Sequence, residues 1–361
     1  MSRQKIVFIT NMYPTNCRPG FGTFVRNSVE GLRQIGCDVE VRSLTSHGAG
    51  FGGYIAFYLA TFFYLLRVRG VAYVHYVSHS SPPVLAALAL NSNLKLVLHY
   101  HGSDAFPERH EPLFRQRVKW LSCAAANKFA SGVIAPSRGF MNKLMECFDL
   151  SEVPSLINPS GGVDRAVFYR ETQVQRSTAV IFAGRMIEGK GAEDAAAVVQ
   201  SLMSQSPVVH AVFVGTGPSR IRVEDMLSQH RERGAVTYYD LLPQDRLAAE
   251  FRKSEVILFP STREGESLGL VWIEAALCGA IPLLMRNGSS GDLLPVHLAS
   301  QLICENVEDM EMKARMILAD PSVREHLRVE LFSALHAEYD SRSVSTHLKE
   351  FLAEVSKVDR S

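Results

Sequence analysis

Short, continuous apolar runs recur along this chain and restrict its fold more than any other sequence feature. The segments between them show helical spacing of apolar side chains, as at Val25, Val29 and Leu32. Runs without polar alternation are typical of strands buried on both faces, as in a parallel sheet covered by helices. We therefore predict an α/β fold. The expected strands are residues 6–9, a strand carrying Val39 and Val41, and residues 72–77, 94–99, 132–135, 178–183, 208–214, 236–239, 255–259 and 281–285.

The chain of 361 residues is too long for one ordinary core, so two doubly wound domains are expected. Residues 156–176 are rich in Pro, Gly, Ser and charge, which is typical of an interdomain connection. We predict domains at 1–165 and 166–341, with a helix at about 342–361 packing back on the first. Ligands bind such domains at the carboxyl ends of the strands. The expected functional loops follow Ile9, Leu98, Ala183, Val214 and Phe259.

Charge and cysteine content narrow the class of protein. The 38 Lys and Arg residues are balanced by 37 Asp and Glu residues, so no net field favours nucleic acid as a partner. The six cysteines form no C-x-x-C pair, which favours reduced thiols. The N-terminal apolar run is too short for a signal peptide. A cytoplasmic protein is therefore expected.

The most apolar stretch, residues 51–66, is followed by Arg67 and Arg69. A membrane-spanning helix needs about 20 apolar residues, so this stretch is too short to cross a bilayer. A buried helix between two strands is the preferred interpretation. A helix lying on a membrane surface is the alternative, which would give a peripheral membrane contact.

The strongest chemical signal is a polar loop that leads into a helix after the strand ending at Phe259. Free backbone amides around residues 268–270, at the helix N-terminus, suit a diphosphate. Glu266 and Glu274 are eight residues apart, about two helical turns, so both are expected along one stripe. Carboxylates accept hydrogen bonds from sugar hydroxyls, and this pair could hold a sugar and a ribose.

This segment resembles the E-x7-E signature of retaining GT-B glycosyltransferases, in particular the group 1 enzymes of glycosyltransferase family four. The resemblance covers Glu266 and Glu274 and, between them, Ser267, Leu268, Gly269 and Leu270. It implies two Rossmann-like domains facing each other across a cleft, the first on the acceptor side and the second binding the donor. The donor would be a UDP- or GDP-sugar, with no separate cofactor and no metal.

Two further loops of the second domain resemble the same family. Gly184-Arg185 and Lys190-Gly191 are similar to its G-R-x(4)-K-G loop, which implies that Arg185 and Lys190 meet the diphosphate. Gly215 and Gly217 are similar to its G-x-G-P turn, where the backbone approaches the nucleotide.

Leu242 corresponds to the position at which the family's backbone meets the base, but Asp240 stands where relatives usually have Gly. This departure leaves the base open between UDP and GDP.

In the first domain, Gly22, with Gly20 second, resembles the glycine loop that closes over donor phosphates. His101 resembles the family's donor-orienting histidine, with His99 as the alternative. A neutral imidazole can hydrogen-bond a sugar hydroxyl. The N-G-V-D-x(3)-F run that links the family's domains is similar to residues 158–168, except that Pro159-Ser160 is inserted.

The resemblance implies transfer with retention, in which His101, Arg185, Lys190 and Glu266 serve the chemistry and Glu266 binds rather than attacks. The expected acceptor is a growing bacterial surface glycan, lipid-linked or soluble. Two alternatives stay open, a sugar-nucleotide epimerase on the same fold and an inactive sugar-nucleotide-binding assembly protein.

Overall fold

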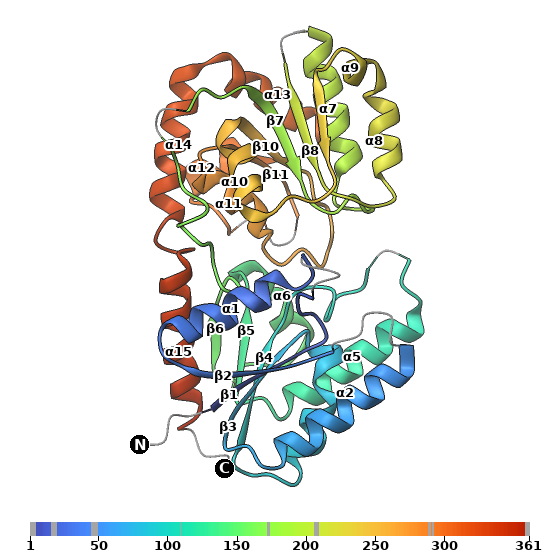
Figure 1. Cartoon of the computed structure of the whole chain (residues 1–361), viewed down its shortest axis with the longest axis vertical. Helices are drawn as coiled ribbons and strands as arrows, with labels where there is room; N and C mark the ends of the chain where they lie inside the picture. Colours follow the sequence, from blue (N-terminus) through green and yellow to red (C-terminus); the bar gives the residue numbers. More distant parts are fainter. Residues whose placement is uncertain are drawn as a thin grey trace. The chain divides into compact units, whose positions relative to one another are not determined.

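The computed structural model of the chain describes residues 5–15, 20–44, 50–108, 110–171, 174–205, 209–287, 290 and 292–357. It divides the chain into two compact units, which we call unit 1 (Met1–Gly162 with Ser341–Ser361) and unit 2 (Val163–Asp340). Each unit contains one six-stranded sheet whose neighbouring strands are all parallel, with helices around it (Figure 1). The predicted α/β class is confirmed.

The sheet of unit 1 has the strand order β2-β1-β3-β4-β5-β6. Its strands are β1 (Lys5–Thr10), β2 (Asp38–Ser43), β3 (Gly70–His75), β4 (Leu94–His99), β5 (Gly132–Ala135) and β6 (Ser155–Ile157). Its helices are α1 (Thr23–Gln34), α2 (Gly50–Leu65), α3 (Val77–Ser80), α4 (Pro82–Leu88), α5 (Leu113–Asn127), α6 (Arg138–Cys147) and α15 (Ser341–Val355).

The two faces of this sheet have separate cores. On one face, Val25, Val29 and Leu32 of α1 pack with Leu348 and Leu352 of α15. The other face is covered by α2, α4, α5 and α6. Helix α15 fits closely against α1, because a Cβ on Gly31 would lie 2.1 Å from the Ser345 hydroxyl. The last helix therefore completes unit 1, and the division between the units falls at residues 162/163 and 340/341.

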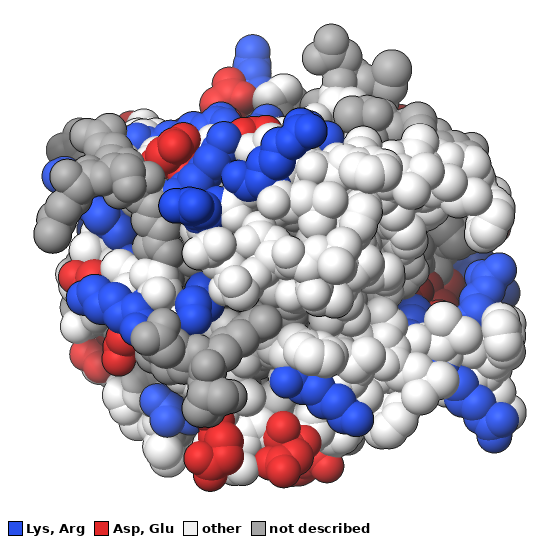
Figure 2. Space-filling view, turned by 90° about the horizontal axis from the view of Figure 1, so that it is seen from below, with Lys and Arg blue, Asp and Glu red and all other residues white. Residues whose placement is uncertain are grey.

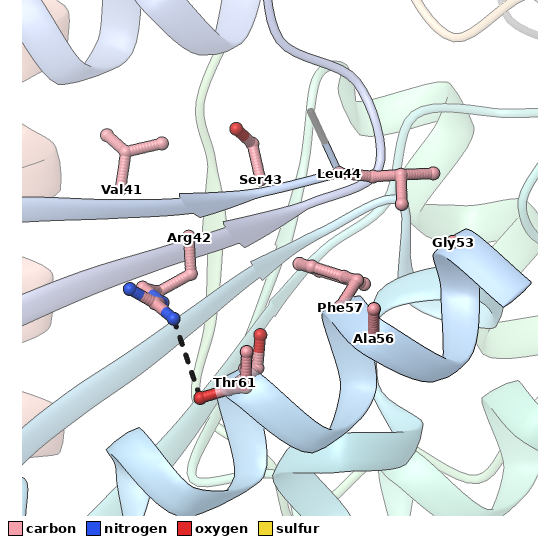
Figure 3. A pocket seen from close by; sticks show the side chains of 9 residues that line it. Val41, Arg42, Ser43, Leu44, Gly53, Ala56, Phe57 and Thr61 are labelled. Carbon is pink, nitrogen blue, oxygen red and sulfur yellow. Dashed lines mark hydrogen bonds between the residues drawn. The ribbon is translucent and has the colours of Figure 1, made fainter. Parts of the chain in front are cut away.

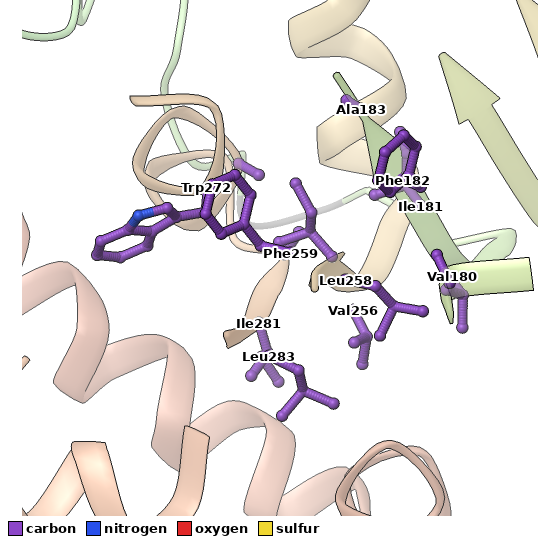
Figure 4. Close-up of a cluster of buried hydrophobic side chains, with 14 of the residues drawn as sticks. Val180, Ile181, Phe182, Ala183, Val256, Leu258, Phe259, Trp272, Ile281 and Leu283 are labelled. Atoms are coloured by element: carbon purple, nitrogen blue, oxygen red, sulfur yellow. The ribbon is translucent and has the colours of Figure 1, made fainter. Parts of the chain in front are cut away.

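The sheet of unit 2 has the order β12-β11-β10-β7-β8-β9. Its strands are β7 (Thr178–Ala183), β8 (Ala211–Val214), β9 (Val236–Tyr239), β10 (Ser254–Phe259), β11 (Ile281–Met285) and β12 (Ile303–Cys304). Its helices are α7 (Ala192–Gln205), α8 (Arg220–Met226), α9 (Ser228–Glu232), α10 (Gln244–Lys253), α11 (Leu270–Leu277), α12 (Val296–Leu302), α13 (Val307–Ala319) and α14 (Pro321–Leu335). Central strands contribute Val180, Val256 and Leu283 to a core that includes the fully buried Trp272 (Figure 4).

Most expected strands are present at or near their predicted bounds. The strand expected at 72–77 ends at His75, because Tyr76 adopts a left-handed φ of 61° and opens α3. In the segment expected at 208–214, the strand is Ala211–Val214, and residue 208 lies outside the described residues. The short strands β6 and β12 were not predicted, since three and two residues cannot form a recognisable apolar run.

The preferred interpretation of residues 51–66 as a buried helix is only partly correct. Helix α2 does connect β2 to β3, and Phe57, Thr61 and Leu65 are buried. Its other side is open to solvent, with Phe51 85% and Phe63 60% exposed. Among the described residues, no helix is both long and apolar enough to cross a membrane.

We predict that Gly215→Ala destabilises unit 2 by about 1–3 kcal/mol. A Cβ at Gly215 would lie 1.9 Å from the Gly184 carbonyl oxygen, and the φ of 143° disfavours any side chain. The matched control is Gly234→Ala, where φ is also positive but no atom lies within 4 Å of the added Cβ. Urea unfolding should show a clearly larger loss for Gly215→Ala, and equal losses would contradict the close approach.

Candidate functional site

The loops after β7 and β10 are joined at the carboxyl edge of the sheet in unit 2. The Gly189 carbonyl accepts a hydrogen bond from the Thr262 amide at 2.9 Å. A Cβ on Gly191 would lie 2.3 Å from the Pro260 carbonyl oxygen, so the two backbones can approach only because this residue is glycine. This contact fixes Lys190, between the two glycines, beside the loop after β10.

Lys190 and Glu266 form an ion pair in this position. The Lys190 Nζ lies 2.5 Å from the Glu266 Oε2, which also accepts a hydrogen bond from the Ser261 hydroxyl at 2.7 Å. Burial alone would raise the pKa of Glu266, but the Lys190 charge and the hydrogen bonds from Lys190 and Ser261 outweigh it and lower that pKa. Glu266 is therefore a firmly ionised carboxylate with one oxygen already occupied.

The prediction that Glu266 and Glu274 lie along one stripe of a helix is wrong. Helix α11 begins only at Leu270, so Glu266 belongs to the preceding loop and Glu274 alone lies on the helix. The chain enters α11 through Gly269, whose φ of 78° is left-handed and whose Cβ would lie 2.4 Å from the Phe259 ring. Residues with extended or left-handed backbone do not continue a helical repeat, which the 3.6-residue spacing assumed.

The N-terminus of α11 has no side-chain cap. Its first amides have no carbonyl partner within the helix, and such amides attract anions. Leu268 is buried just before it, and its carbonyl accepts a hydrogen bond from the Trp272 indole at 2.9 Å. Ser267 lies in the same loop. The expected phosphate-binding loop and helix start are thus adjacent in the structure.

Glu274 differs from Glu266 in having no partner in the described part of the chain. It is partly buried, and no hydrogen bond or opposite charge among the described residues offsets the burial of its carboxylate. Burial raises the pKa of Glu274 to about 7. An unpaired carboxyl group at this depth is available to accept hydrogen bonds from a ligand.

The remaining predicted residues of unit 2 lie at the ends of β7, β8 and β9. Gly184, Gly215 and Gly217 are at the close approach between the loops after β7 and β8, where the Met186 amide donates to the Thr216 carbonyl at 2.8 Å. Arg185 is exposed in this loop.

Leu242, after β9, is partly buried against the core of unit 2. Asp240, which replaces the expected Gly, forms an ion pair with Arg220, with 3.2 Å between the Asp240 Oδ1 and the Arg220 Nη1. Arg220 also donates to the Gly215 carbonyl at 2.9 Å. The departure at Asp240 therefore has a local partner that ties the ends of β8 and β9 together.

Unit 1 places three histidines together at the ends of β3 and β4. The His75 Nδ1 and His101 Nε2 are 2.9 Å apart, and the two rings are inclined by only 13°. His75 and His99 are register partners on these neighbouring strands. Burial lowers the pKa of all three, that of His101 to about 3, so the cluster is neutral at ordinary pH.

Ser160 bridges two of these rings from the loop after β6. Its hydroxyl lies 3.3 Å from the His99 Nε2 and 3.5 Å from the His101 Nδ1. Ser160 is buried and adopts a left-handed φ of 53°. This backbone conformation is unfavourable for most residues other than Gly, Asn and Asp. Tyr73 completes the network through a hydrogen bond of 2.6 Å to the His99 Nδ1.

Asp104 fixes the backbone around His101. Its Oδ1 accepts hydrogen bonds from the amides of His101 and Gly102 at 3.0 and 2.8 Å, and its Oδ2 accepts from Val77 at 3.0 Å. The carboxylate thereby joins the loops after β3 and β4. The H-G-x-D pattern contained this aspartate, but nothing in the sequence indicated its backbone partners.

The nitrogens of His75, His99 and His101 all lie within 4.8 Å of one another, a spacing that a metal ion could also require. Two ligand nitrogens on one zinc are about 3.3 Å apart with lone pairs that converge on the ion. Here the rings of His75 and His101 are nearly parallel, with facing nitrogens 2.9 Å apart. Both nitrogens of His99 and the second nitrogen of His101 face Ser160 or Tyr73, whereas the His75 Nε2 is buried without a hydrogen-bond partner among the described residues. This geometry is that of a hydrogen-bond network.

Gly22 caps α1 with a left-handed φ of 74°, and its Cβ would lie 2.5 Å from the Met12 carbonyl oxygen. The turn before α1 therefore requires glycine at position 22. Gly20 is exposed, and Pro19 before it lies outside the described residues.

Two hollows lie near these elements. The one beside Glu266 and Trp272 has a volume of only about 10 Å³, too small for a nucleotide. The other, in unit 1, has a volume of about 400 Å³ and lies between β2 and α2, lined by Arg42, Leu44 and Phe57 among others (Figure 3). It contains none of the predicted site residues.

The network partners His75, Ser160 and Ser261 were not found from the sequence. His75 lay inside the strand predicted at 72–77, and only the observed end of β3 at His75 places it at the same sheet edge as His99. Ser160 stood out only as an insertion, and Ser261 had no signal of its own.

Comparison with known proteins shows the fold. Structures of low identity match nearly the whole chain. Sucrose-phosphate synthase from Thermosynechococcus elongatus has a TM-score of 0.78 and 18% identity, with 98% of this chain and 99% of that chain covered. Anabaena Alr3699/HepE in complex with UDP and glucose has a TM-score of 0.74 and 16% identity, covering 97% and 100%. The chain has the GT-B fold.

Residues 168–329 match the family model described as glycosyl transferases group 1. The sulfoquinovosyl transferase SQD2 of Arabidopsis thaliana is 28% identical over 76% of this chain and 55% of its own length. The phosphatidylinositol N-acetylglucosaminyltransferase gpi3 subunit of Schizosaccharomyces pombe is 23% identical over 60% and 52%. The chain thus spans about half the length of the curated relatives it matches.

We predict that Ser160→Gly and Ser160→Ala both change the ring ¹⁵N chemical shifts of His99 and His101, because each removes the bridging hydroxyl. Their stabilities should differ, since glycine relieves the left-handed strain and alanine keeps it, by roughly 1 kcal/mol. NMR of histidine-labelled protein and thermal unfolding would check both. Unchanged imidazole signals in the two variants would contradict the bridge.

We predict that Glu274→Gln becomes increasingly stable relative to the original protein as pH rises from 5 to 8. The pKa of about 7 in the fold exceeds that of the unfolded chain, so the native state favours the protonated form. That preference stabilises the fold at low pH and is lost as pH rises through 7, by at most about 3 kcal/mol. Thermal unfolding across this range is the measurement, and parallel curves would show an ordinary pKa.

Proposed function

We propose that the chain is a retaining glycosyltransferase that transfers a sugar from a nucleoside diphosphate sugar to a glycan or lipid-linked acceptor. The observation that carries this proposal is the position of Lys190, held by Glu266 of the loop that leads into the uncapped N-terminus of α11. A fixed ammonium group and a set of free amides at one sheet edge suit a diphosphate. The group 1 match and the GT-B fold support the same reading.

In this proposal, charge on the leaving diphosphate is neutralised by protein groups. Lys190 supplies a compact charge, and Arg185, exposed in the same loop, supplies a planar guanidinium. Fixed donors aimed at developing charge lower the barrier because they need no reorganisation during the reaction. These groups make a metal ion unnecessary, and we propose that transfer is metal-independent.

The two glutamates take different roles. Glu266 has one oxygen occupied by Lys190 and Ser261, so it binds a donor-sugar hydroxyl with the other rather than attacking carbon. Glu274, which has no hydrogen-bond partner among the described residues, accepts from the ribose hydroxyls. The neutral His101 orients the sugar by hydrogen bonding. Retention of configuration is carried over from the family resemblance.

The donor is a UDP- or GDP-sugar, and UDP has support from the solved relative that binds UDP and glucose. The acceptor we propose is a bacterial surface polysaccharide under construction, at or near the cytoplasmic face of the membrane. Its support is the exposed apolar helix α2 in unit 1 and a curated relative named for phosphatidylinositol.

The test is a thermal-shift panel of UDP-, GDP- and ADP-sugars followed by transfer assays with the stabilising donor. A ligand that binds only the native state raises its stability, so the correct donor should stand out. Arg185→Gln and Lys190→Gln should each lower transfer by about a hundredfold, as for loss of a fixed donor to developing charge. Arg246→Gln, on the exposed side of α10, is the matched control.

The same assays separate the alternatives. Conversion of the sugar nucleotide without acceptor would indicate an epimerase. Donor binding without any turnover would indicate a binding protein. Loss of transfer with EDTA, restored by Mg²⁺ or Mn²⁺, would contradict metal independence.

A further inference from the structure

Helix α2 has no polar side. Its residues Phe51, Ile55, Leu59 and Phe63 follow one another every four positions and are 85%, 43%, 53% and 60% exposed. Residues at this spacing lie on one stripe of a helix. A helix on the surface of a globular protein normally turns charged or polar residues to solvent. Packing within the fold therefore does not explain why the stripe on α2 is apolar.

The rest of α2 is already used. Phe57 and Leu65 are buried in the core of unit 1. Gly53, Ala56 and Ala60 line the hollow next to Arg42 of β2 (Figure 3). The exposed stripe is separate from both of these sides, so neither the core nor the hollow explains it.

A second stripe of the same kind lies on α5. Phe114, Val118 and Leu121 share one side of this helix and are 75%, 49% and 59% exposed. Helices α2 and α5 cover the same face of the sheet, with α4 in contact with both (Figure 1). Leu90, just after α4, is 72% exposed. We call these eight residues the α2–α5 face: Phe51, Ile55, Leu59, Phe63, Leu90, Phe114, Val118 and Leu121.

Basic side chains predominate around the α2–α5 face, and the nearest acidic residues in the sequence, Glu108 and Glu111, come just before α5. No Asp or Glu occurs from residue 41 to 103 or from 112 to 145. The exposed charged residues next to the stripes are Arg67, Arg69, Arg115, Arg117 and Lys128. Figure 2 shows a broad area without charged side chains, surrounded by more Lys and Arg than Asp and Glu side chains. Because the whole chain is nearly balanced in charge, this basic rim is a local feature.

We propose that the α2–α5 face docks on the surface of an anionic lipid bilayer. The apolar stripes would enter the boundary between headgroups and acyl chains, and the basic rim would meet lipid phosphates. Helix α2 has 16 residues and lies along the unit's surface, so it binds in the plane of the membrane rather than across it.

The charge pattern favours a bilayer over a second copy of this chain. A symmetric dimer through this face would place the same patch on both sides of the interface. The two mainly basic rims would then oppose each other, and like charges facing each other weaken an interface. An anionic bilayer offers both the apolar interior and the opposite charge.

The experiment is flotation of the full chain with vesicles of phosphatidylcholine, alone or mixed with phosphatidylglycerol. We expect binding to the anionic vesicles that weakens as salt is raised, with roughly a fivefold loss in partition for each basic side chain removed. The variant Leu59→Asp with Phe63→Asp should abolish flotation. Its matched control is Ile221→Asp with Val296→Asp, two exposed apolar positions of unit 2, which should float like the original protein.

The charge-reversal variant Arg115→Glu with Arg117→Glu tests the rim without touching any packed side chain, with Arg233→Glu and Arg246→Glu as its control. It should lose at least tenfold in partition at low salt and keep its unfolding temperature. Failure of the original chain to float with either vesicle would overturn the proposal. So would dimers in light scattering that Leu59→Asp with Phe63→Asp converts to monomers, because a second copy would then cover the face. None of these readouts depends on transferase activity.

Discussion

The close approach of three loops at the carboxyl edge of one sheet is the constraint on which the candidate donor site depends. The loops after β7, β8 and β10 touch through backbone at Gly215 and Gly191, where any Cβ would collide with a carbonyl oxygen. Because the backbones are in contact, the Lys190 side chain reaches Glu266, and both side chains are largely buried. In that setting the ion pair is strong, so Glu266 stays ionised despite its burial.

Burial acts in opposite directions on the charged groups of the molecule, according to their partners. Glu266 has a lysine and remains charged, whereas Glu274, a few residues along, has no described partner and its pKa rises to about 7. In unit 1, burial without a counter-charge leaves His75, His99 and His101 neutral, with His75 hydrogen-bonded to His101 and His99 hydrogen-bonded to Tyr73 and Ser160. One unit thus presents fixed charges suited to a diphosphate, and the other presents neutral donors and acceptors suited to hydroxyls.

Sequence patterns predicted the sheets well because a strand buried on both faces leaves a continuous apolar run, as in β4, β5, β7 and β11. They failed where a signal needs long-range information. The helical stripe for Glu266 was wrong because Gly269 turns the chain just before α11. Ser160 could not be assigned because its partners, His99 and His101, lie about sixty residues away. The outer side of α2 was misjudged because composition does not distinguish a buried apolar helix from an uncovered one.

The two faces of the sheet in unit 1 are covered differently. On one face α1 is itself covered at its side by α15, so the chain returns from unit 2 to close that core. On the other face α2, α4 and α5 are the outermost layer, and no described segment packs over their stripes. Exposing so much apolar surface weakens solubility, and surface mutations to polar residues would cost little stability there. Basic side chains also predominate around this face, and this combination fits an external anionic surface better than an incomplete core.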